Sequence, residues 1–242
     1  MKKCFAIFPT LALLLLTACG PAAPVSSDLT TEAQRQEVRS VMEGAGLSNV
    51  DTFFSWVEEY NEAAAADTFL DSDTNCRLTA FLLLQGLVES NPVTDYGTYL
   101  MMDVDALDRD PRYELLKDQK GTFISLFNQV SVAEKTEDYL QAFPKAWEER
   151  GVHFPEGKVS LVSVVMNDSG EQCLFIGHTG VLIEGEKTLW FIEKLAPDKP
   201  YRATKYADRG ALAAALLGRA EYTLGDEDFP TFLLENDRVL QS

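Results

Sequence analysis

The apolar residues of this chain change their spacing near residue 150, and this change restricts the fold more than any other feature. Before it, apolar side chains recur at helical spacing in three segments: 31–42, 51–60 and 75–89. After it, segments rich in Val, Ile, Phe and Trp alternate with turn-forming residues, as in an antiparallel meander: 159–166, 172–182 and 187–195. Helices that precede a sheet predict an α+β fold.

Segment 75–89 is expected to be the central buried helix, packed on the sheet, because Leu and Phe surround nearly its whole circumference. The remaining pattern predicts a loop at 103–111, helices at 114–130, 134–150 and 207–222, and a short strand at 232–234. Residues 31–242 have the length of a single α+β domain. Its first helix begins with the reciprocal capping pattern of Thr31 and Gln34.

Residues 1–18 have the form of a secretory signal. A basic head of two lysines precedes an apolar run over 5–16, which is shorter than the roughly 20 residues of a membrane-spanning helix. The ending Leu16-Thr17-Ala18-Cys19 resembles the bacterial lipobox, which implies cleavage before Cys19 and lipidation of that cysteine. An ordinary signal cut after Ala18, with Cys19 left as a free thiol, is the alternative.

Lipidation predicts an extracytoplasmic protein whose partner is a bacterial cell membrane, held through Cys19. Residues 19–30 are small, include two prolines and lack hydrophobic periodicity, so they are expected to form a lipidated flexible tether. The chain carries 21 Lys and Arg against 38 Asp and Glu, a formal net charge of −17. This acidity argues against nucleic acid as a partner and against a polybasic contact with anionic lipid, and it favours a soluble surface.

Cys76 follows Asn75 at the start of the predicted central helix. The first turn of a helix has unpaired N–H groups and the positive end of the helix dipole, which favour a thiolate and can hold an oxyanion. Cys76 is therefore a candidate nucleophile. The alternative is a small buried core residue without chemistry.

A histidine and a carboxylate on the predicted meander complete a candidate triad. If Gly185-Glu186 forms a two-residue turn, His178 lies directly opposite Glu193 on the same face of the hairpin. The carboxylate would then orient the imidazole as a catalytic base requires. A three-residue turn would place Ile192 opposite instead, and a purely structural His–Glu pair is the other alternative.

Cys173 lies five residues from His178 on the same predicted strand, and is therefore expected on the opposite face. An alternative role for it is a disulfide with Cys76, which would abolish the nucleophile.

Three blocks, Asn75–Phe81, Gly177–Val181 and Leu189–Lys194, resemble an uncharacterised family of bacterial lipoproteins that carries domain of unknown function 4300. The order of a cysteine on a helix, a histidine on a strand and an acidic residue on the next strand also resembles the papain-like superfamily, which includes cell-wall endopeptidases and amidases. This second resemblance implies Cys76 as nucleophile, His178 as base and Glu193 as the orienting residue. Papain-like peptidases usually carry a glutamine before the cysteine for the oxyanion hole; Asn75 is the nearest amide here.

The implied reaction is hydrolysis or transfer at an amide or thioester through an acyl-cysteine, on a peptide or cell-wall substrate. The alternative is a noncatalytic surface or substrate-binding lipoprotein of the same fold, which would show a broad exposed aromatic patch that includes Trp190.

Other site chemistries fit the sequence less well, and neither a metal nor a cofactor is expected. Two histidines and no His-Glu-x-x-His motif argue against a histidine-rich zinc site. Residues 71–75 open like a calcium loop, but Cys76 replaces the needed glycine and Leu82 the bidentate glutamate. An acidic segment is expected to be a solvated loop rather than a cation site: Asp103, Asp105, Asp108 and Asp110.

Overall fold

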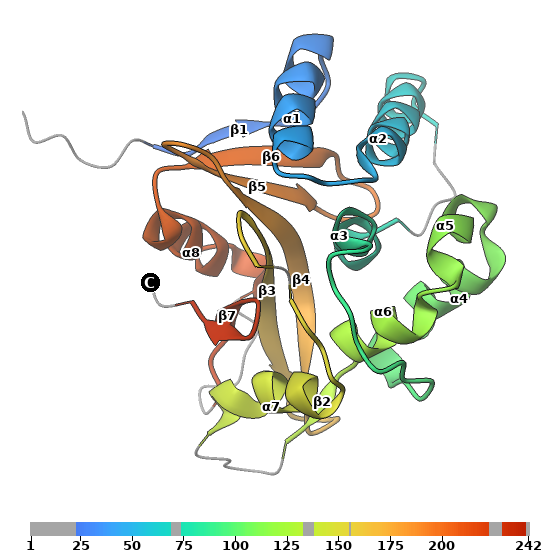
Figure 1. The fold of residues 1–242 in the computed structure, drawn as a ribbon, viewed down its shortest axis with the longest axis vertical. Helices are drawn as coiled ribbons and strands as arrows, with labels where there is room; N and C mark the ends of the chain where they lie inside the picture. Colours follow the sequence, from blue (N-terminus) through green and yellow to red (C-terminus); the bar gives the residue numbers. More distant parts are fainter. Residues whose placement is uncertain (1–22, 69–73, 133–137, 155, 223–228, 241–242) are drawn as a thin grey trace, which may run out of the picture.

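The described strands form one antiparallel sheet of eight, with helices on both faces (Figure 1). This computed structural model describes residues 23–68, 74–132, 138–154, 156–222 and 229–240. The sheet runs in the order β1-β6-β5-β4-β3-β7-β8, and β2 pairs with β4. The helices of the first half pack on the sheet of the second, which confirms the predicted α+β class.

The element bounds are as follows. The strands are β1 Val25–Ser27, β2 Val130–Ser131, β3 Val159–Asp168, β4 Cys173–Glu184, β5 Leu189–Lys194, β6 Tyr201–Tyr206, β7 Phe232–Glu235 and β8 Arg238–Val239. The α-helices are α1 Glu32–Gly44, α2 Val50–Ala65, α3 Cys76–Leu84, α4 Met101–Arg109, α5 Glu114–Lys117, α6 Lys120–Phe127, α7 Ala142–Glu149 and α8 Arg209–Leu217. Four 3-10 turns, counted within the described residues, are η1 Thr98–Leu100, η2 Pro111–Tyr113, η3 Tyr139–Gln141 and η4 Ala220–Tyr222.

The two faces of the sheet bury separate apolar clusters, because successive strand residues point to opposite sides. The larger cluster joins one set of strand residues, such as Val181 and Ile192, to α1, α2, α3, α6 and α7. The smaller joins the alternate set, such as Leu182 and Phe191, to the apolar side of α8. Figure 1 shows α3 and α8 on opposite sides of the sheet.

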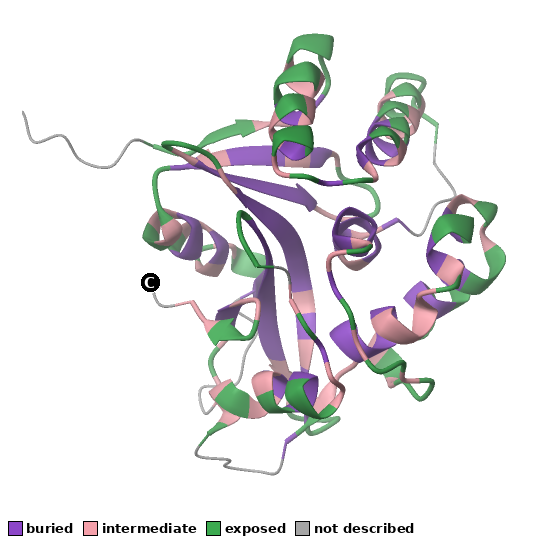
Figure 2. Ribbon diagram, in the orientation of Figure 1, coloured by how far each residue is buried: buried purple, intermediate pink, exposed green. Residues whose placement is uncertain are grey.

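Helix α3 is the central helix of the larger face, as predicted. Every residue from Leu78 to Leu84 is buried, and Figure 2 shows most of the helix in the colour of buried residues. In contrast, α1 and α2 bury one side and expose the other (Figure 2). A helix that is apolar all round must be covered on all sides, so the position of its first residue is closely constrained.

The predicted loop at 103–111 was wrong, since residues 101–109 form α4. Val104 and Leu107 bury one side of this helix, while its acidic residues pair with bases: Asp103 with Arg77, Asp105 with Arg109, and Asp108 with Lys120. These ion pairs and the Val–Leu spacing stabilise a helix that the run of aspartates obscures in the sequence.

Other boundaries differ from the predicted ones in smaller ways. The predicted helix 114–130 divides into α5 and α6 and ends in β2, and 207–222 divides into α8 and η4. Of 134–150, the described part holds η3 and α7. Strand β6, which pairs with β5 along its length, was missed.

Residues 25–30 belong to the fold, which corrects the expected tether over 19–30. Strand β1 pairs with β6, the Asp28 carboxylate accepts a hydrogen bond from Arg202 Nε at 2.6 Å, and the Leu29 side chain is fully buried. The reciprocal capping bonds between Thr31 and Gln34 are present at the start of α1. The predicted signal over 1–18 and Cys19 lie outside the described residues. Among the residues described, no helix is both long and apolar enough to cross a membrane.

Candidate active site

Asn75 determines where α3 begins. Its side-chain oxygen accepts hydrogen bonds from the backbone N–H groups of Arg77 at 2.9 Å and Leu78 at 3.1 Å. An asparagine in extended conformation is a favoured N-cap for this reason. Cys76 is therefore the first helical residue, and no hydrogen bond between described residues engages its backbone N–H. That N–H lies at the positive end of α3 and can donate a hydrogen bond to an oxyanion.

A buried ion pair ties this helix start to the sheet. The Arg77 guanidinium pairs with the fully buried Asp103 carboxylate at 2.6 Å and donates to the carbonyl of Ile176 in β4 at 3.0 Å. Asp103 also accepts a hydrogen bond from the Asn75 side-chain amide. The Asn75 amide is thus committed to positioning α3, and Asp103 is neither a solvated nor a cation-binding residue. Sequence reasoning missed Arg77, because its partner is distant in the chain and was assigned to a loop.

A β-bulge at Gly177 places His178. In the β3–β4 ladder, Val164 pairs with His178 and Val165 with Ile176, so Gly177 is an extra residue without a partner. A Cβ at this position would lie 2.2 Å from Met166 Sδ, which explains the glycine. Bulges re-aim the side chains beside them and are common near active sites.

The bulge also corrects the predicted placement of Cys173. Asp168 pairs with Cys173 and Val164 with His178, and these two β3 residues are four apart, so Cys173 and His178 share a face. They remain far apart along β4, by roughly 16 Å at about 3.3 Å per residue. Cys173 and Cys76 are both free thiols, so the alternative disulfide is not formed.

The hairpin turn is longer than predicted, yet His178 and Glu193 still meet. The connection between β4 and β5 spans four residues, because Glu184 pairs with Leu189. This shifts the register by two, and an even shift keeps both side chains on the predicted face but makes Glu193 diagonal to His178. The ladder ends at Val181 and Ile192, and the two side chains meet just beyond it, with His178 Nε2 and Glu193 Oε2 2.7 Å apart.

Cys76 lies beside the ring of His178 at this point, close enough for each group to shift the pKa of the other, and both residues line the same pocket, so the three predicted triad residues come together. Since Glu193 occupies Nε2, the other ring nitrogen, Nδ1, is the one left for the Cys76 thiol. Cys76 is 9% exposed, whereas His178 and Glu193 are almost fully buried. Cys76 is therefore the most exposed residue of the three.

The electrostatics favour a thiolate–imidazolium pair. Burial by itself would raise the pKa of Cys76, but the charge and hydrogen bond of His178, the charge of Arg77 and the backbone N–H of Thr179 together lower it below the usual value. Burial would lower the pKa of His178, yet Cys76 and Glu193 raise it to about 9. By contrast, burial and nearby carboxylates raise the pKa of the Cys173 thiol to about 11.

Arg219 and Tyr222 complete the surroundings of the triad. The Arg219 guanidinium pairs with both oxygens of Glu193, each at 2.7 Å, and also donates to the Tyr222 hydroxyl at 3.3 Å. The Tyr222 ring stacks on His178 with centroids 5.3 Å apart. Burial would raise the pKa of Glu193, but His178 and Arg219 lower it to about 2. Arg219 and Tyr222 were missed by the sequence analysis, since the sequence showed them only as part of a predicted helix, with no identifiable partner.

An open pocket of about 780 Å³ gives access to Cys76 and His178. It is formed by the start of α3, by residues of β4 and β6, by the β5–β6 connection and by the segment after α8. Its lining residues are Asn75, Cys76, Arg77, Gly177, His178, Leu195, Ala196, Pro197, Lys199, Arg202, Arg219, Glu221 and Tyr222.

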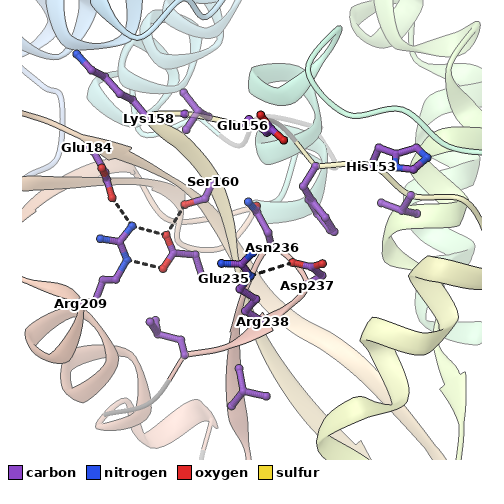
Figure 3. Close-up of a pocket in the computed structure, with 16 residues that line it drawn as sticks. His153, Glu156, Lys158, Ser160, Glu184, Arg209, Glu235, Asn236, Asp237 and Arg238 are labelled. Atoms are coloured by element: carbon purple, nitrogen blue, oxygen red, sulfur yellow. Dashed lines mark hydrogen bonds and ion pairs between the residues drawn. The ribbon is translucent and has the colours of Figure 1, made fainter.

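A second hollow, of about 850 Å³, lies beside β7 and β8 and has no cysteine in its lining (Figure 3). Figure 3 shows the Arg209 guanidinium joined to Glu184 and Glu235, with Ser160 also bonded to Glu235. Arg209, Glu184 and Glu235 are thus paired with one another. The larger hollow thus lacks the nucleophile that the smaller pocket contains.

Two alternatives from the sequence find no counterpart in the described residues. Trp190 is buried beneath the Lys205 ammonium, 4.5 Å from its ring, so it belongs to no exposed aromatic patch. The large apolar side chains exposed among these residues include one aromatic: Val25, Tyr96, Met101, Met102 and Leu115. Within the same residues, no group of three or more His, Cys, Asp or Glu side chains is arranged to hold a metal ion.

A family model described as a domain of unknown function, DUF4300, matches residues 65–240 of the chain. The chain belongs to this family. The DUF4300 match includes α3, the hairpin of β4 and β5, and the segment after α8, and therefore all residues of the site. No curated protein and no solved structure matches the chain.

Proposed function

We propose that this DUF4300 protein is a thiol hydrolase that cleaves an amide or peptide bond through an acyl-cysteine. The observation that carries the proposal is the meeting of Cys76, His178 and Glu193 at an open pocket, with Cys76 at a helix N-terminus and its pKa lowered. Perturbed pKa values of a nucleophile and a base in mutual contact are typical of catalytic sites.

In the acylation step, Cys76 Sγ attacks the carbonyl carbon and the backbone N–H of Cys76 faces the oxyanion. The C–N bond then breaks, and the leaving amine takes a proton from the His178 imidazolium, which leaves a thioester. Neutral His178 next removes a proton from water, and the resulting hydroxide attacks the thioester. The acid product leaves, the thiolate is restored and His178 is protonated again.

The other residues position these groups. Glu193 accepts the Nε2–H of His178 and stabilises its charged form, and Arg219 holds Glu193 by both oxygens. Asn75 and Arg77 fix the start of α3 against β4. The order of helix cysteine and strand histidine resembles the papain-like superfamily. The Arg–Glu support differs from the usual pattern, and so does the lack of a glutamine in residues 71–75, directly before the cysteine.

We further propose that the protein is an extracytoplasmic lipoprotein, anchored to a bacterial membrane through Cys19. The support is the basic head, the short apolar run and the Leu-Thr-Ala-Cys ending. Mass spectrometry of the N-terminal peptide from membranes tests this: a diacylated Cys19 is expected, and a peptide that begins with unmodified Cys19 or that retains the signal contradicts it.

Alkylation kinetics test the catalytic proposal. An unperturbed thiol is about 0.3% ionised at pH 6, given a pKa of about 8.5. We expect iodoacetamide to modify Cys76 at that pH much faster than Cys173, the internal control in the same chain, and His178→Ala to slow Cys76 by at least about tenfold. Equal rates for the two cysteines, or a Cys76 rate unaffected by His178→Ala, would overturn the assignment.

A further inference from the structure

The charged side chains that line the candidate site are mostly basic, whereas the whole chain is acidic. The formal net charge is −17, yet the pocket is lined by four basic side chains and one acidic one, Glu221. The basic residues are Arg77, Lys199, Arg202 and Arg219. Basic side chains that line a recess can attract an anion to it, provided that their own carboxylate partners can be displaced.

The four basic residues divide into two pairs by depth. Arg77 and Arg219 lie at the base of the pocket, where their partners Asp103 and Glu193 are fully buried carboxylates. These two guanidinium groups are satisfied and act on the thiol and the histidine. They are therefore unsuited to exchange partners with a substrate.

Lys199 and Arg202 are the more exposed pair, and their ion pairs are at least partly open to solvent. The Lys199 side chain is 60% exposed and pairs with Asp198, which is 63% exposed. The Arg202 side chain is 31% exposed and pairs with Asp28, which is 41% exposed. Neither aspartate lines the pocket. Ion pairs of this kind contribute little to the stability of a protein, so an incoming anion can take the place of either aspartate.

We infer that the pocket selects a substrate with a carboxylate close to the scissile amide, held by Arg202 and Lys199. This inference rests on the proposed function and names its substrate class, an acidic peptide or N-acyl amino acid. A guanidinium binds a carboxylate in a planar, two-point arrangement, and Lys199 supplies a second charge on a flexible stem. The apolar part of the lining, Leu195 to Pro197, contacts the uncharged portion.

The test compares two small alkylating reagents, iodoacetate and iodoacetamide, at Cys76 in the full chain. They differ mainly in the carboxylate, so the ratio of their rate constants reports attraction of that group. The His178 imidazolium also attracts iodoacetate, so a preference in the wild-type protein is not the readout. The readout is the change in the ratio in Lys199→Gln/Arg202→Gln. The matched control is Arg109→Gln/Lys145→Gln, which removes the same charge from exposed pairs elsewhere.

We expect Lys199→Gln/Arg202→Gln to lower the iodoacetate-to-iodoacetamide ratio about tenfold at low salt and the control to leave it near the wild-type value. The effect should largely disappear near 1 M salt, where the screening length is about 3 Å. Glu221→Gln removes the one acidic lining residue and should raise the ratio, a gain that misfolding cannot produce.

Two results overturn the inference and are distinct from each other. In the first, Cys76 reacts fast with iodoacetamide, but the iodoacetate-to-iodoacetamide ratio changes equally in Lys199→Gln/Arg202→Gln and in the control, or changes in neither variant. Lys199 and Arg202 then do not recognise carboxylates, while the proposed hydrolase still stands. If Cys76 reacts as slowly as Cys173 with both reagents, the proposed function fails and the inference fails with it.

Discussion

Replacement of Arg219 by methionine should destabilise the protein by about 3 kcal/mol at neutral pH. The Glu193 carboxylate is fully buried, and Arg219 approaches each of its oxygens at 2.7 Å. Methionine has similar length but no donor, so Glu193 keeps only its bond to His178. Removing one partner of a buried pair costs about 3–5 kcal/mol, and the lower end applies because the Arg219 side chain is 18% exposed.

The pH dependence of this loss has a definite sign. The pKa of Glu193 is lowered to about 2, below its unfolded value of about 4.3. Its contribution to stability is therefore complete above about pH 4.3 and is lost as the pH falls toward about 2. Arg219→Met raises this pKa and reduces the contribution. The difference in unfolding free energy between wild type and variant should thus be largest above about pH 5 and shrink below about pH 4.

Urea unfolding of the full chain at several pH values measures this difference. Arg112→Met is the matched control, because the Arg112 side chain is also 18% exposed but its partner Glu59 is 44% exposed. We expect it to cost no more than about 1 kcal/mol. A cost for Arg219→Met equal to that of Arg112→Met, or one that does not vary with pH, would refute the assigned role of the Arg219–Glu193 pair.

Three further predictions concern the frame around the site. A chain that begins at residue 31 loses β1 and the fully buried Leu29. Its unfolding free energy should be lower by at least about 2 kcal/mol than that of a chain that begins at residue 20, and its urea midpoint should fall accordingly. An unchanged midpoint contradicts this. Burial lowers the pKa of Lys194 to about 7 despite the charge of Asp198, so the wild-type protein loses stability as the pH falls from about 10 to about 7. In urea unfolding, the free energy of unfolding of Lys194→Met relative to wild type should therefore be higher at pH 7 than at pH 9.5. A relative free energy that is higher at pH 9.5 would contradict this. Gly177→Ala forces its methyl group against Met166 Sδ and should lower the Cys76 alkylation rate together with a loss of about 1–3 kcal/mol, whereas an unaltered rate would show that the bulge does not aim His178.

Local signals in the sequence predicted much of the fold. The Thr31–Gln34 capping box and the Asn75 cap each depend on residues within three positions of one another, so both helix starts are where the sequence places them. Alternating apolar residues predicted β3, β4 and β5 for a similar reason. Helix α4 was missed because its aspartates suggest a loop until their basic partners are known, and Arg77 lies outside the helix itself.

The hairpin shows how a wrong local detail can leave the site intact. A two-residue turn was predicted, and a four-residue connection is present. Because side chains alternate with a period of two, the error of two in register left His178 and Glu193 on one face, whereas an error of one would have separated them. The bulge at Gly177, by contrast, reversed the expected relation of Cys173 to His178, since one extra residue changes the alternation.

The sequence by itself determined that Cys76 stands at a helix start and that His178 and Glu193 share a face of a hairpin, because both follow from contacts between residues close in the chain or from strand periodicity. Only the tertiary structure decided that Arg77 finds Asp103, that Arg219 finds Glu193, and that the thiol meets the imidazole where β4 and β5 separate. Those contacts join residues 26 or more positions apart. Their formation depends on how the two faces of the sheet are covered, and the sequence carries no periodic signal for it.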